Sequence, residues 1–370
     1  MQGKSRIREK GFETVEKIGV IGAFGFDALK ETTGGQPVKT RTLYYSLCEK
    51  YGRDNVLCVE TYRWKKNPVK MILELMLVIR KCNAIILLPA QNGIKVFLNV
   101  LLNTKKKNTR LYYDVIGGWI AEKANGDLNL LNQLKMLDGI WVETSSMKND
   151  LSKIGILNTE VIPNFKNIQK LELSDLPKAH NEPYYFCTFS RVMEEKGITQ
   201  AITTVNEINN QREKPIIFLD IYGPIDEAYK DKFEALLFSR PWVQYKGVVD
   251  PEKSVDTVKG YDALLFPTRF YTEGIPGTII DSYSAGVPIM TSLWMNSGDV
   301  FWDGETGWGY DFDDEKGLEK LINRFLEDPN EFFAMKETCL DKAELFSRNS
   351  IMKKIAYIIE TGEKHGDKPI

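Results

Sequence analysis

Histidine is nearly absent from this chain of 370 residues, which contains only His180 and His365. A mechanism that needs a histidine base or a histidine-rich metal site would have to use one of these two. Cysteine is also scarce, since the five cysteines are far apart and form no Cys-x-x-Cys pair. This pattern excludes a disulfide scaffold and a zinc ribbon, and it is typical of a protein in a reducing cytosol.

Long hydrophobic runs are missing as well. The longest, from Met71 to Ile79, is interrupted by Glu74, and it is far shorter than the roughly 20 residues of a membrane-spanning helix. The first 17 residues are charged and lack the apolar stretch of a signal peptide. We therefore expect a cytoplasmic protein. Its length and its hydrophobic content of 43% predict two globular domains.

The net charge of −2 hides an uneven distribution of charge. Residues 1–170 contain 27 Lys or Arg and 16 Asp or Glu, whereas the remainder contains 22 and 35. Such a split predicts that the first half faces an anionic partner, which could be nucleic acid, an anionic membrane surface or a phosphorylated substrate. No nucleic-acid-binding motif is present, so nucleic acid is not expected to be that partner.

Two apolar segments, 69–79 and 96–102, lie beside clusters of basic residues. These clusters are Arg63, Lys65, Lys66 and Lys70, and Lys105, Lys106, Lys107 and Arg110. One interpretation is a pair of helices that lie on an anionic membrane surface, which would make the protein peripheral to the membrane. The other is a pair of ordinary crossover helices packed on a sheet, with solvated lysines between them.

Apolar segments rich in β-forming residues alternate with segments of helical periodicity along the whole chain. The expected strands cover residues 17–23, 55–60, 84–89, 109–115, 139–143, 159–162, 184–189, 215–222, 243–245, 261–266 and 287–290. A polar stretch, 166–183, separates the two series and is typical of a linker. This alternation predicts an α/β protein with two doubly wound domains, and ligands of such sheets bind beyond the carboxyl ends of the strands.

Two loops that follow expected strands are suited to binding an anion. In the first, Gly34 and Gly35 precede a helix, so that the backbone and the helix amides can approach a negative charge. In the second, Arg191 and Lys196 follow the strand 184–189. A guanidinium and an ammonium group together suit a diphosphate. The alternative is that Arg191 forms a surface ion pair with Glu194 or Glu195.

The third loop, from Pro267 to Pro288, carries the strongest signal. Glu273 lies between a strand and a helix, the segment Gly274-Ile275-Pro276-Gly277 follows, and Asp281 comes one turn into the helix. The loop amides can bind one end of a ligand while Asp281 reaches neighbouring hydroxyl groups. The alternative for Asp281 is stabilisation of the helix N-terminus.

The second half of the chain resembles the retaining glycosyltransferases of family 4, which have the GT-B fold. The resemblance covers about residues 184–346. It rests on three motifs of the family. The motif G-R-x4-K-G corresponds to Ser190-Arg191-(x4)-Lys196-Gly197, and the motif D-G-x-T-G corresponds to Asp303-Gly304-Glu305-Thr306-Gly307. The third, in which a proline with Ser or Thr precedes E-G and then E-A-x-A-x-G-x-P, corresponds to the segment from Pro267 to Pro288, with four residues between Thr268 and Glu273. In the first half it is thinner and consists of Gly34-Gly35, Glu143-Thr144-Ser145 and Ile162-Pro163-Asn164.

Two departures from the family pattern matter for function. Asp281 replaces the second glutamate of the family, which shortens its reach by one methylene group but keeps the carboxylate. The histidine that often contacts the donor sugar has no counterpart in the segment 112–119. Asp114 or the backbone at Gly117-Gly118 would have to take its role.

The resemblance implies two Rossmann-like domains that face each other across a cleft. Residues 1–166 would form the acceptor-side domain, which the final helix, 347–370, rejoins, and residues 167–346 would bind the donor. The implied reaction transfers a sugar, with retention, from a nucleotide-diphosphate sugar, which we expect to be a UDP-sugar. The implied acceptor is a glycan or a lipid-linked glycan in the synthesis of cell-surface polysaccharide.

The same resemblance assigns roles to individual residues. Arg191, Lys196 and the amides of Gly274 to Gly277 would hold the diphosphate, and Glu273 would contact hydroxyl groups of the sugar. The remaining implied contacts are Asp281 to the ribose, Val248 and Val249 to the base, and Gly34 and Gly35 to the distal phosphate. Positive charge at the leaving group would replace a metal, so no metal or other cofactor is expected. The segment Asp311-Phe312-Asp313-Asp314 is interpreted as structural.

Two further functions stay open. The chain could be a catalytically silent partner subunit of the same fold, although Arg191, Lys196 and Glu273 are all present. It could also be a sugar-nucleotide epimerase, a reaction that usually needs histidine contacts. A covalent mechanism with Glu273 as nucleophile would need a second carboxylate at a suitable position, and the sequence shows none.

Overall fold

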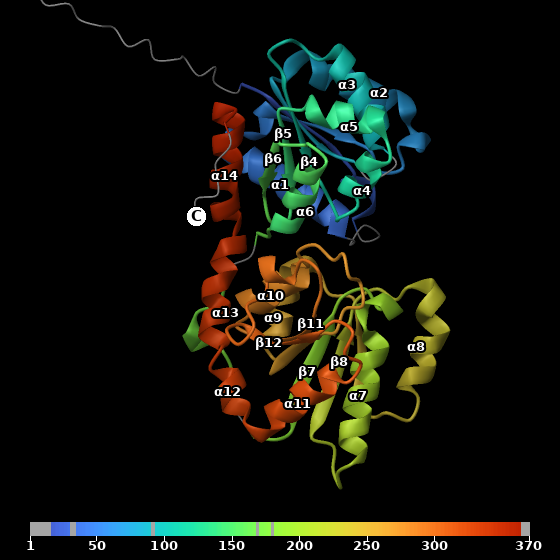
Figure 1. Ribbon diagram of the computed structural model, residues 1–370, viewed down its shortest axis with the longest axis vertical. Helices are drawn as coiled ribbons and strands as arrows, with labels where there is room; N and C mark the ends of the chain where they lie inside the picture. Colours follow the sequence, from blue (N-terminus) through green and yellow to red (C-terminus); the bar gives the residue numbers. More distant parts are fainter. Residues whose placement is uncertain (1–15, 30–34, 90–92, 168–169, 179–180, 364–370) are drawn as a thin grey trace, which may run out of the picture.

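The computed structural model describes residues 16–29, 35–89, 93–167, 170–178 and 181–363. Three residues singled out above, Gly34, His180 and His365, lie outside these ranges. The described chain forms two α/β domains, one above the other in Figure 1. Within the described ranges, no helix is both long and apolar enough to cross a membrane.

The first domain is built on a parallel sheet of six strands in the order β2-β1-β3-β4-β5-β6. Its strands are β1 (Ile18–Gly22), β2 (Val56–Glu60), β3 (Ala84–Leu88), β4 (Arg110–Asp114), β5 (Gly139–Val142) and β6 (Thr159–Val161). All residues of β1 and β3 are buried, as continuous apolar runs are in a sheet covered on both faces. Each of these strands matches an expected one to within a residue or two.

Helices cover both faces of the first sheet. They are α1 (Gly35–Tyr51), α2 (Pro68–Lys81), α3 (Ile94–Thr104), α4 (Ile120–Asn125), α5 (Leu128–Lys135), α6 (Ser145–Lys153) and the last helix of the chain, α14 (Arg348–Thr361). The helices α2 to α6 share one hydrophobic core, whereas α1 and α14 share the other. Ile351 and Ile355 of α14 pack with Leu43 and Tyr44 of α1, so the end of the chain returns to the first domain (Figure 1).

The second domain has a parallel sheet in the order β12-β11-β10-β7-β8-β9. Its strands are β7 (Tyr184–Phe189), β8 (Ile217–Tyr222), β9 (Val243–Gly247), β10 (Ala263–Phe266), β11 (Ile289–Leu293) and β12 (Gly307–Asp311). The strand β12 was not expected, because its sequence GWGYD contains two glycines, which have low strand propensity. Its pairing with β11 along all five residues fixes it as a strand.

The helices of the second domain also lie on both faces of the sheet. They are α7 (Ile198–Asn210), α8 (Lys230–Leu237), α9 (Ser254–Val258), α10 (Gly277–Ser284), α11 (Gly317–Glu327), α12 (Pro329–Phe333) and α13 (Lys336–Ala343). The sequence of residues 330–346 predicts one continuous helix, and this prediction is wrong, because the structure has the two helices α12 and α13 there. Phe332 and Met335 pack in the core on one face of the sheet, whereas Cys339 and Phe346 pack on the other. A straight helix cannot reach both faces, so the chain breaks and turns around the sheet edge.

Candidate active site

The loops at the carboxyl ends of the two sheets meet between the domains. The centre is the loop 267–276, which joins β10 to α10. From the first domain, the Asn164 side chain donates to the carbonyl oxygen of Ile275 at 3.1 Å. Ser145, the first residue of α6, donates its backbone N–H to both carboxylate oxygens of Asp299 at 3.1 Å. The two domains are therefore in direct contact around this loop.

Lys196 and Glu273 form an ion pair across two loops of the second domain. Both side chains are mostly buried, and the Thr268 hydroxyl lies 3.5 Å from the same carboxylate oxygen of Glu273. The ammonium group of Lys196 also lies 5.9 Å from the ring centres of Phe266 and Phe270. The structure thus brings together two predicted site residues that are 77 positions apart in the sequence.

Gly197 allows the loop that carries Lys196 to approach the loop 267–276. Its φ is +70°, and a Cβ atom there would lie 1.8 Å from the carbonyl oxygen of Pro267. The two loops are also joined by a hydrogen bond from the Arg269 N–H to the carbonyl oxygen of Glu195, at 2.8 Å. The glycine of the Lys196-Gly197 motif is therefore required by this close contact.

Arg191 lies at the surface in the segment between β7 and Lys196, with 54% of its side chain exposed. Its nearest acidic partner is Asp226, at 3.9 Å, and not Glu194 or Glu195 as the alternative interpretation expected. Glu194 pairs with Lys232 instead, at 2.7 Å. Since an exposed pair at such a distance is weak, the guanidinium group of Arg191 is available to an anionic ligand.

Asp281 is held on α10 by a lysine from the connection between the domains. Its side chain is only 2% exposed, and one carboxylate oxygen contacts the Lys166 ammonium group at 2.5 Å. In the described part of the chain, its other oxygen is buried without a hydrogen-bond partner. Asp281 thus points to the interdomain side of α10. It can bind a ribose there only if the ribose and Lys166 share its carboxylate.

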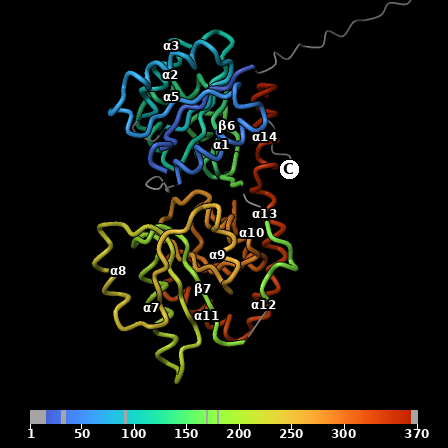
Figure 2. Tube along the Cα trace, turned by 180° about the vertical axis from the view of Figure 1, so that it is seen from behind, coloured from blue at the N-terminus to red at the C-terminus, as the bar shows by residue number. Residues whose placement is uncertain are grey.

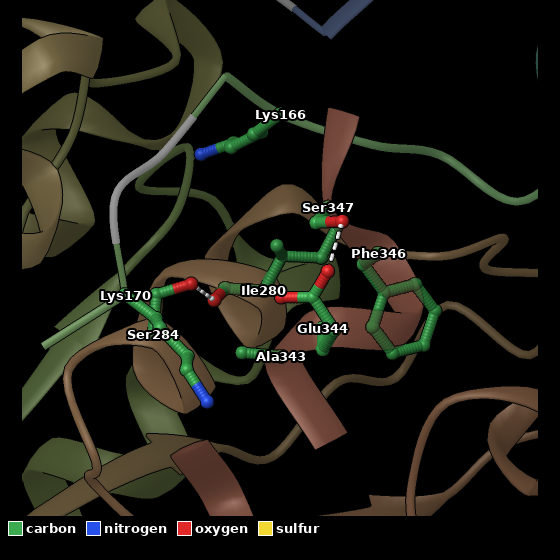
Figure 3. A pocket seen from close by; sticks show the side chains of 8 residues that line it. All are labelled: Lys166, Lys170, Ile280, Ser284, Ala343, Glu344, Phe346 and Ser347. Atoms are coloured by element: carbon green, nitrogen blue, oxygen red, sulfur yellow. Dashed lines mark hydrogen bonds between the residues drawn. The ribbon is translucent and has the colours of Figure 1, made fainter. Parts of the chain in front are cut away.

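A small pocket lies next to this ion pair. It has a volume of about 30 Å³ and lies between α10 and the segment that leads into α14. Lys166 is at its edge, and Ser347 donates to Glu344 at 2.9 Å on its far side (Figure 3). A cavity of this size holds a water molecule and is far too small for a sugar nucleotide. It therefore belongs to the hinge between the domains.

The glycines of the loop 274–277 are positions of close approach. A Cβ atom on Gly274 would lie 2.3 Å from the Glu143 carboxylate, and one on Gly277 would lie 2.8 Å from Cε of Lys166. Glu143 also accepts the backbone N–H of Ile275 at 3.4 Å. The loop amides expected to bind a ligand are thus already covered on one side by the first domain.

A buried charge cluster of Lys39, Asp114 and Glu143 supports this contact. The Lys39 ammonium group lies 2.8 Å from Asp114 and 3.0 Å from Glu143, and all three side chains are buried. Burial raises the pKa of Asp114 to about 6, although Lys39 opposes the shift. The two carboxylates hold the pKa of Lys39 above its usual value despite its burial. Asp114 therefore does not face the cleft as a free group.

The sequence did not single out Lys39, and it gave Glu143 only as part of a short family motif. One sequence signal could have indicated this cluster. Asp114 is the last residue of β4, and Glu143 directly follows β5. These strands are neighbours in the sheet, so two carboxylates at their ends need a cation between them.

The remaining predicted positions lie at the edges of this region. Val248, which is exposed, and Val249, which is half-buried, follow β9, the edge strand. Gly35 is the first residue of α1.

The acidic segment 311–314 is occupied by local contacts. Asp314 accepts the Lys316 N–H at 3.1 Å and pairs with Lys320 at 2.7 Å. Within the described ranges, no group of three His, Cys, Asp or Glu residues could hold a metal ion.

Comparison with known proteins identifies the fold. Residues 171–341 match the family model described as glycosyl transferases group 1. No curated protein sequence matches the chain.

Solved structures match almost the whole chain. The Anabaena protein HepE in complex with UDP and glucose is 16% identical with a TM-score of 0.71, over 92% of this chain and 98% of that chain. Sucrose-phosphate synthase from Thermosynechococcus elongatus is 16% identical with a TM-score of 0.70, over 93% and 98%. The lipopolysaccharide outer core galactosyltransferase WaaB in its apo form is 16% identical with a TM-score of 0.66, over 93% and 99%. The predicted GT-B fold is confirmed.

Proposed function

We propose that the protein is a retaining, metal-independent hexosyltransferase that uses a nucleotide-diphosphate sugar. The observation that carries this proposal is the Lys196–Glu273 pair at the carboxyl edge of the second sheet, with Arg191 exposed in the segment that leads from β7 to Lys196. The family match over residues 171–341 supports the same assignment. The UDP and UDP-glucose bound to HepE favour UDP as the nucleotide.

The proposed donor lies across the loops that follow β7, β9 and β10. Arg191 and Lys196 neutralise its diphosphate, and the amides of the loop 274–277 donate hydrogen bonds to it. Glu273 then binds hydroxyl groups of the sugar. Since Lys196 contacts both Glu273 and the proposed diphosphate, it links the sugar to the leaving group as the bond between them breaks.

Three further contacts, with the base, the ribose and the distal phosphate, complete the proposed donor site. The base lies against Val248 and Val249, and the ribose hydroxyls share the Asp281 carboxylate with Lys166. In the structure Lys166 holds that carboxylate from the connection between the domains. The loop with Gly34 and Gly35 closes on the distal phosphate from the first domain.

The proposed acceptor is a glycan or a lipid-linked glycan of the cell surface. Its support is the fold shared with WaaB, which is a lipopolysaccharide outer core galactosyltransferase. The acceptor would bind to the first domain, whose strands β4 and β5 end at the cleft. We propose that this reaction takes place on the cytoplasmic side of the membrane.

The experiment is turnover of a panel of UDP-sugars with lipid-linked glycan acceptors, followed by mass spectrometry and NMR of the product. Glu273→Gln should abolish turnover, whereas Glu327→Gln, at an exposed position of the same domain, should not change it. A product with the anomeric configuration of the donor supports retention. Binding of UDP without any turnover would instead indicate a silent partner subunit, and conversion of the donor without an acceptor would indicate an epimerase.

A further inference from the structure

The helix α2 exposes an apolar face to solvent. Leu75 and Val78 point into the core of the first domain, yet the opposite side of the helix is apolar as well. The exposed residues are Val69, Ile72, Leu73, Met76 and Leu77, with exposed fractions between 42% and 65%. Their spacing places them on one side of the helix. A surface helix normally carries polar residues there, so this face is suited to an apolar environment.

The neighbouring helix α3 extends this surface. Both helices cover the same face of the first sheet, and both views place them side by side at its outer side (Figures 1 and 2). Val96 and Val100 of α3 are exposed, and so is Trp64, which lies just before α2. We call these eight exposed residues of α2, α3 and the preceding turn the apolar face.

Basic residues lie at both ends of the apolar face. Lys65 and Lys66 precede α2, and Arg80 and Lys81 end it, all of them exposed. Lys106 and Lys107 follow α3 and are exposed too. The single acidic residue of α2, Glu74, is half-buried and accepts the backbone N–H of Glu60 at 3.2 Å. The surroundings of the apolar face are therefore strongly cationic.

We propose that the apolar face lies in the headgroup region of an anionic lipid bilayer. The apolar side chains of a helix that lies in the membrane plane contact the acyl chains, while flanking Lys and Arg contact anionic headgroups. With 14 residues, α2 is about 21 Å long, so its two basic ends contact headgroups on both sides of the apolar residues. A second copy of this chain fits less well, because it would bring two cationic surfaces together.

Both views place α2 and α3 at the end of the first domain that is away from the second domain (Figures 1 and 2). A bilayer at the apolar face would therefore not cover the loops that meet between the domains. This inference does not depend on the proposed sugar transfer, because membrane binding is measured without a substrate.

The test is co-sedimentation of the full chain with vesicles of phosphatidylcholine alone or mixed with phosphatidylglycerol, at low and high salt. We expect binding to the anionic vesicles at low salt and weaker binding at high salt. The triple variant Ile72→Ser, Leu73→Ser and Met76→Ser should lose at least about tenfold in binding, since it removes the centre of the apolar face. Because these side chains are exposed, its thermal unfolding should stay close to that of the unmodified protein.

A second variant tests the cations. Replacing Lys65, Lys66, Lys106 and Lys107 with Gln should weaken binding to anionic vesicles by at least about tenfold. Lys105 is left in place because it contacts Asp138 at 3.8 Å. The matched controls are Lys214→Gln with Lys316→Gln, and Phe238→Ser, at exposed positions of the second domain. These should bind as the unmodified protein does.

Four outcomes would overturn the proposal. They are no binding at low salt, equal binding to phosphatidylcholine alone, unchanged binding of the triple serine variant, and a dimer in light scattering that this variant abolishes. UDP-sugar turnover with a soluble acceptor is measured in parallel. A protein that turns over the donor but does not bind vesicles refutes the membrane inference alone, and the reverse result refutes the proposed reaction alone.

Discussion

The carboxylate of Glu143 connects the two domains, because one oxygen accepts the Lys39 ammonium group at 3.0 Å and the other accepts the backbone N–H of Ile275 at 3.4 Å. The first contact lies inside the first domain, and the second reaches the glycine loop of the second domain. A protein carboxylate thus occupies a backbone amide that the proposed site assigns to the diphosphate of the donor.

Replacing Glu143 with Gln should therefore strengthen the binding of UDP. The variant removes a negative charge near the proposed diphosphate but keeps the shape of the side chain, and we expect an affinity gain of roughly three- to tenfold at low salt. Isothermal titration calorimetry measures it. Glu122→Gln, at an exposed position of the same domain, is the control and should leave the affinity unchanged. Equal or weaker binding by Glu143→Gln would contradict the proposed position of the diphosphate.

Arg191→Ala and Lys196→Ala should both reduce turnover, each by about 2–4 kcal/mol of transition-state stabilisation, because each removes a charge from the leaving group. They should differ in stability. Arg191 is exposed, so its loss should leave urea unfolding unchanged, whereas loss of Lys196 leaves Glu273 half-buried without its cation and should cost about 1–3 kcal/mol. Near-normal turnover of either variant would show that its cation does not bind the diphosphate.

Lys39→Met should destabilise the protein more at high pH than at low pH. Burial already raises the pKa of Asp114 to about 6 in the folded protein, and loss of Lys39 should raise it further. A carboxyl group whose folded pKa exceeds its unfolded pKa favours folding when it is protonated, and this contribution is lost as the pH rises through the folded pKa.

We expect the Lys39→Met variant to lose about 3–5 kcal/mol of unfolding free energy above the folded pKa of Asp114, where the Asp114 carboxylate is charged and buried without its cation. Below it the loss should be smaller. Urea unfolding at about pH 5 and about pH 8 measures the difference. Lys50→Met, at an exposed position of the same helix, should show no such pH dependence. An equal loss of unfolding free energy at both pH values would contradict a raised pKa of Asp114 in the folded protein.

Activity should survive removal of divalent metal ions by EDTA, because Arg191 and Lys196 provide positive charge at the proposed leaving group. The variant Asp311→Asn with Asp313→Asn should also stay active, since both residues are exposed and lie at the end of β12 and just after it. Turnover of UDP-sugar with and without chelator measures the effect. Complete loss of activity that manganese or magnesium restores would make Asp311, Asp313 and Asp314 candidate ligands again.

The alternation of apolar segments with segments of helical periodicity was sufficient to predict most strands and the loops that follow them. Arg191, Lys196 and Glu273 were singled out because charged residues next to glycines at strand ends are typical of ligand sites in such sheets, and their roles stay predictions. The strand β12 was missed because its residues have little intrinsic preference for a strand. The break between α12 and α13 was missed because it depends on where the sheet ends.

The sequence by itself therefore determined the two doubly wound sheets and the positions of the loops at their carboxyl ends, since both follow from the local periodicity of apolar residues. Only the tertiary structure decided which charges meet. Lys39 and Glu143 are separated by 104 positions, and Lys166 and Asp281 by 115, so no local pattern relates them. The tertiary structure also decided that Leu73 is exposed and Leu75 buried, because burial depends on whether another element covers a side chain and not on the side chain itself.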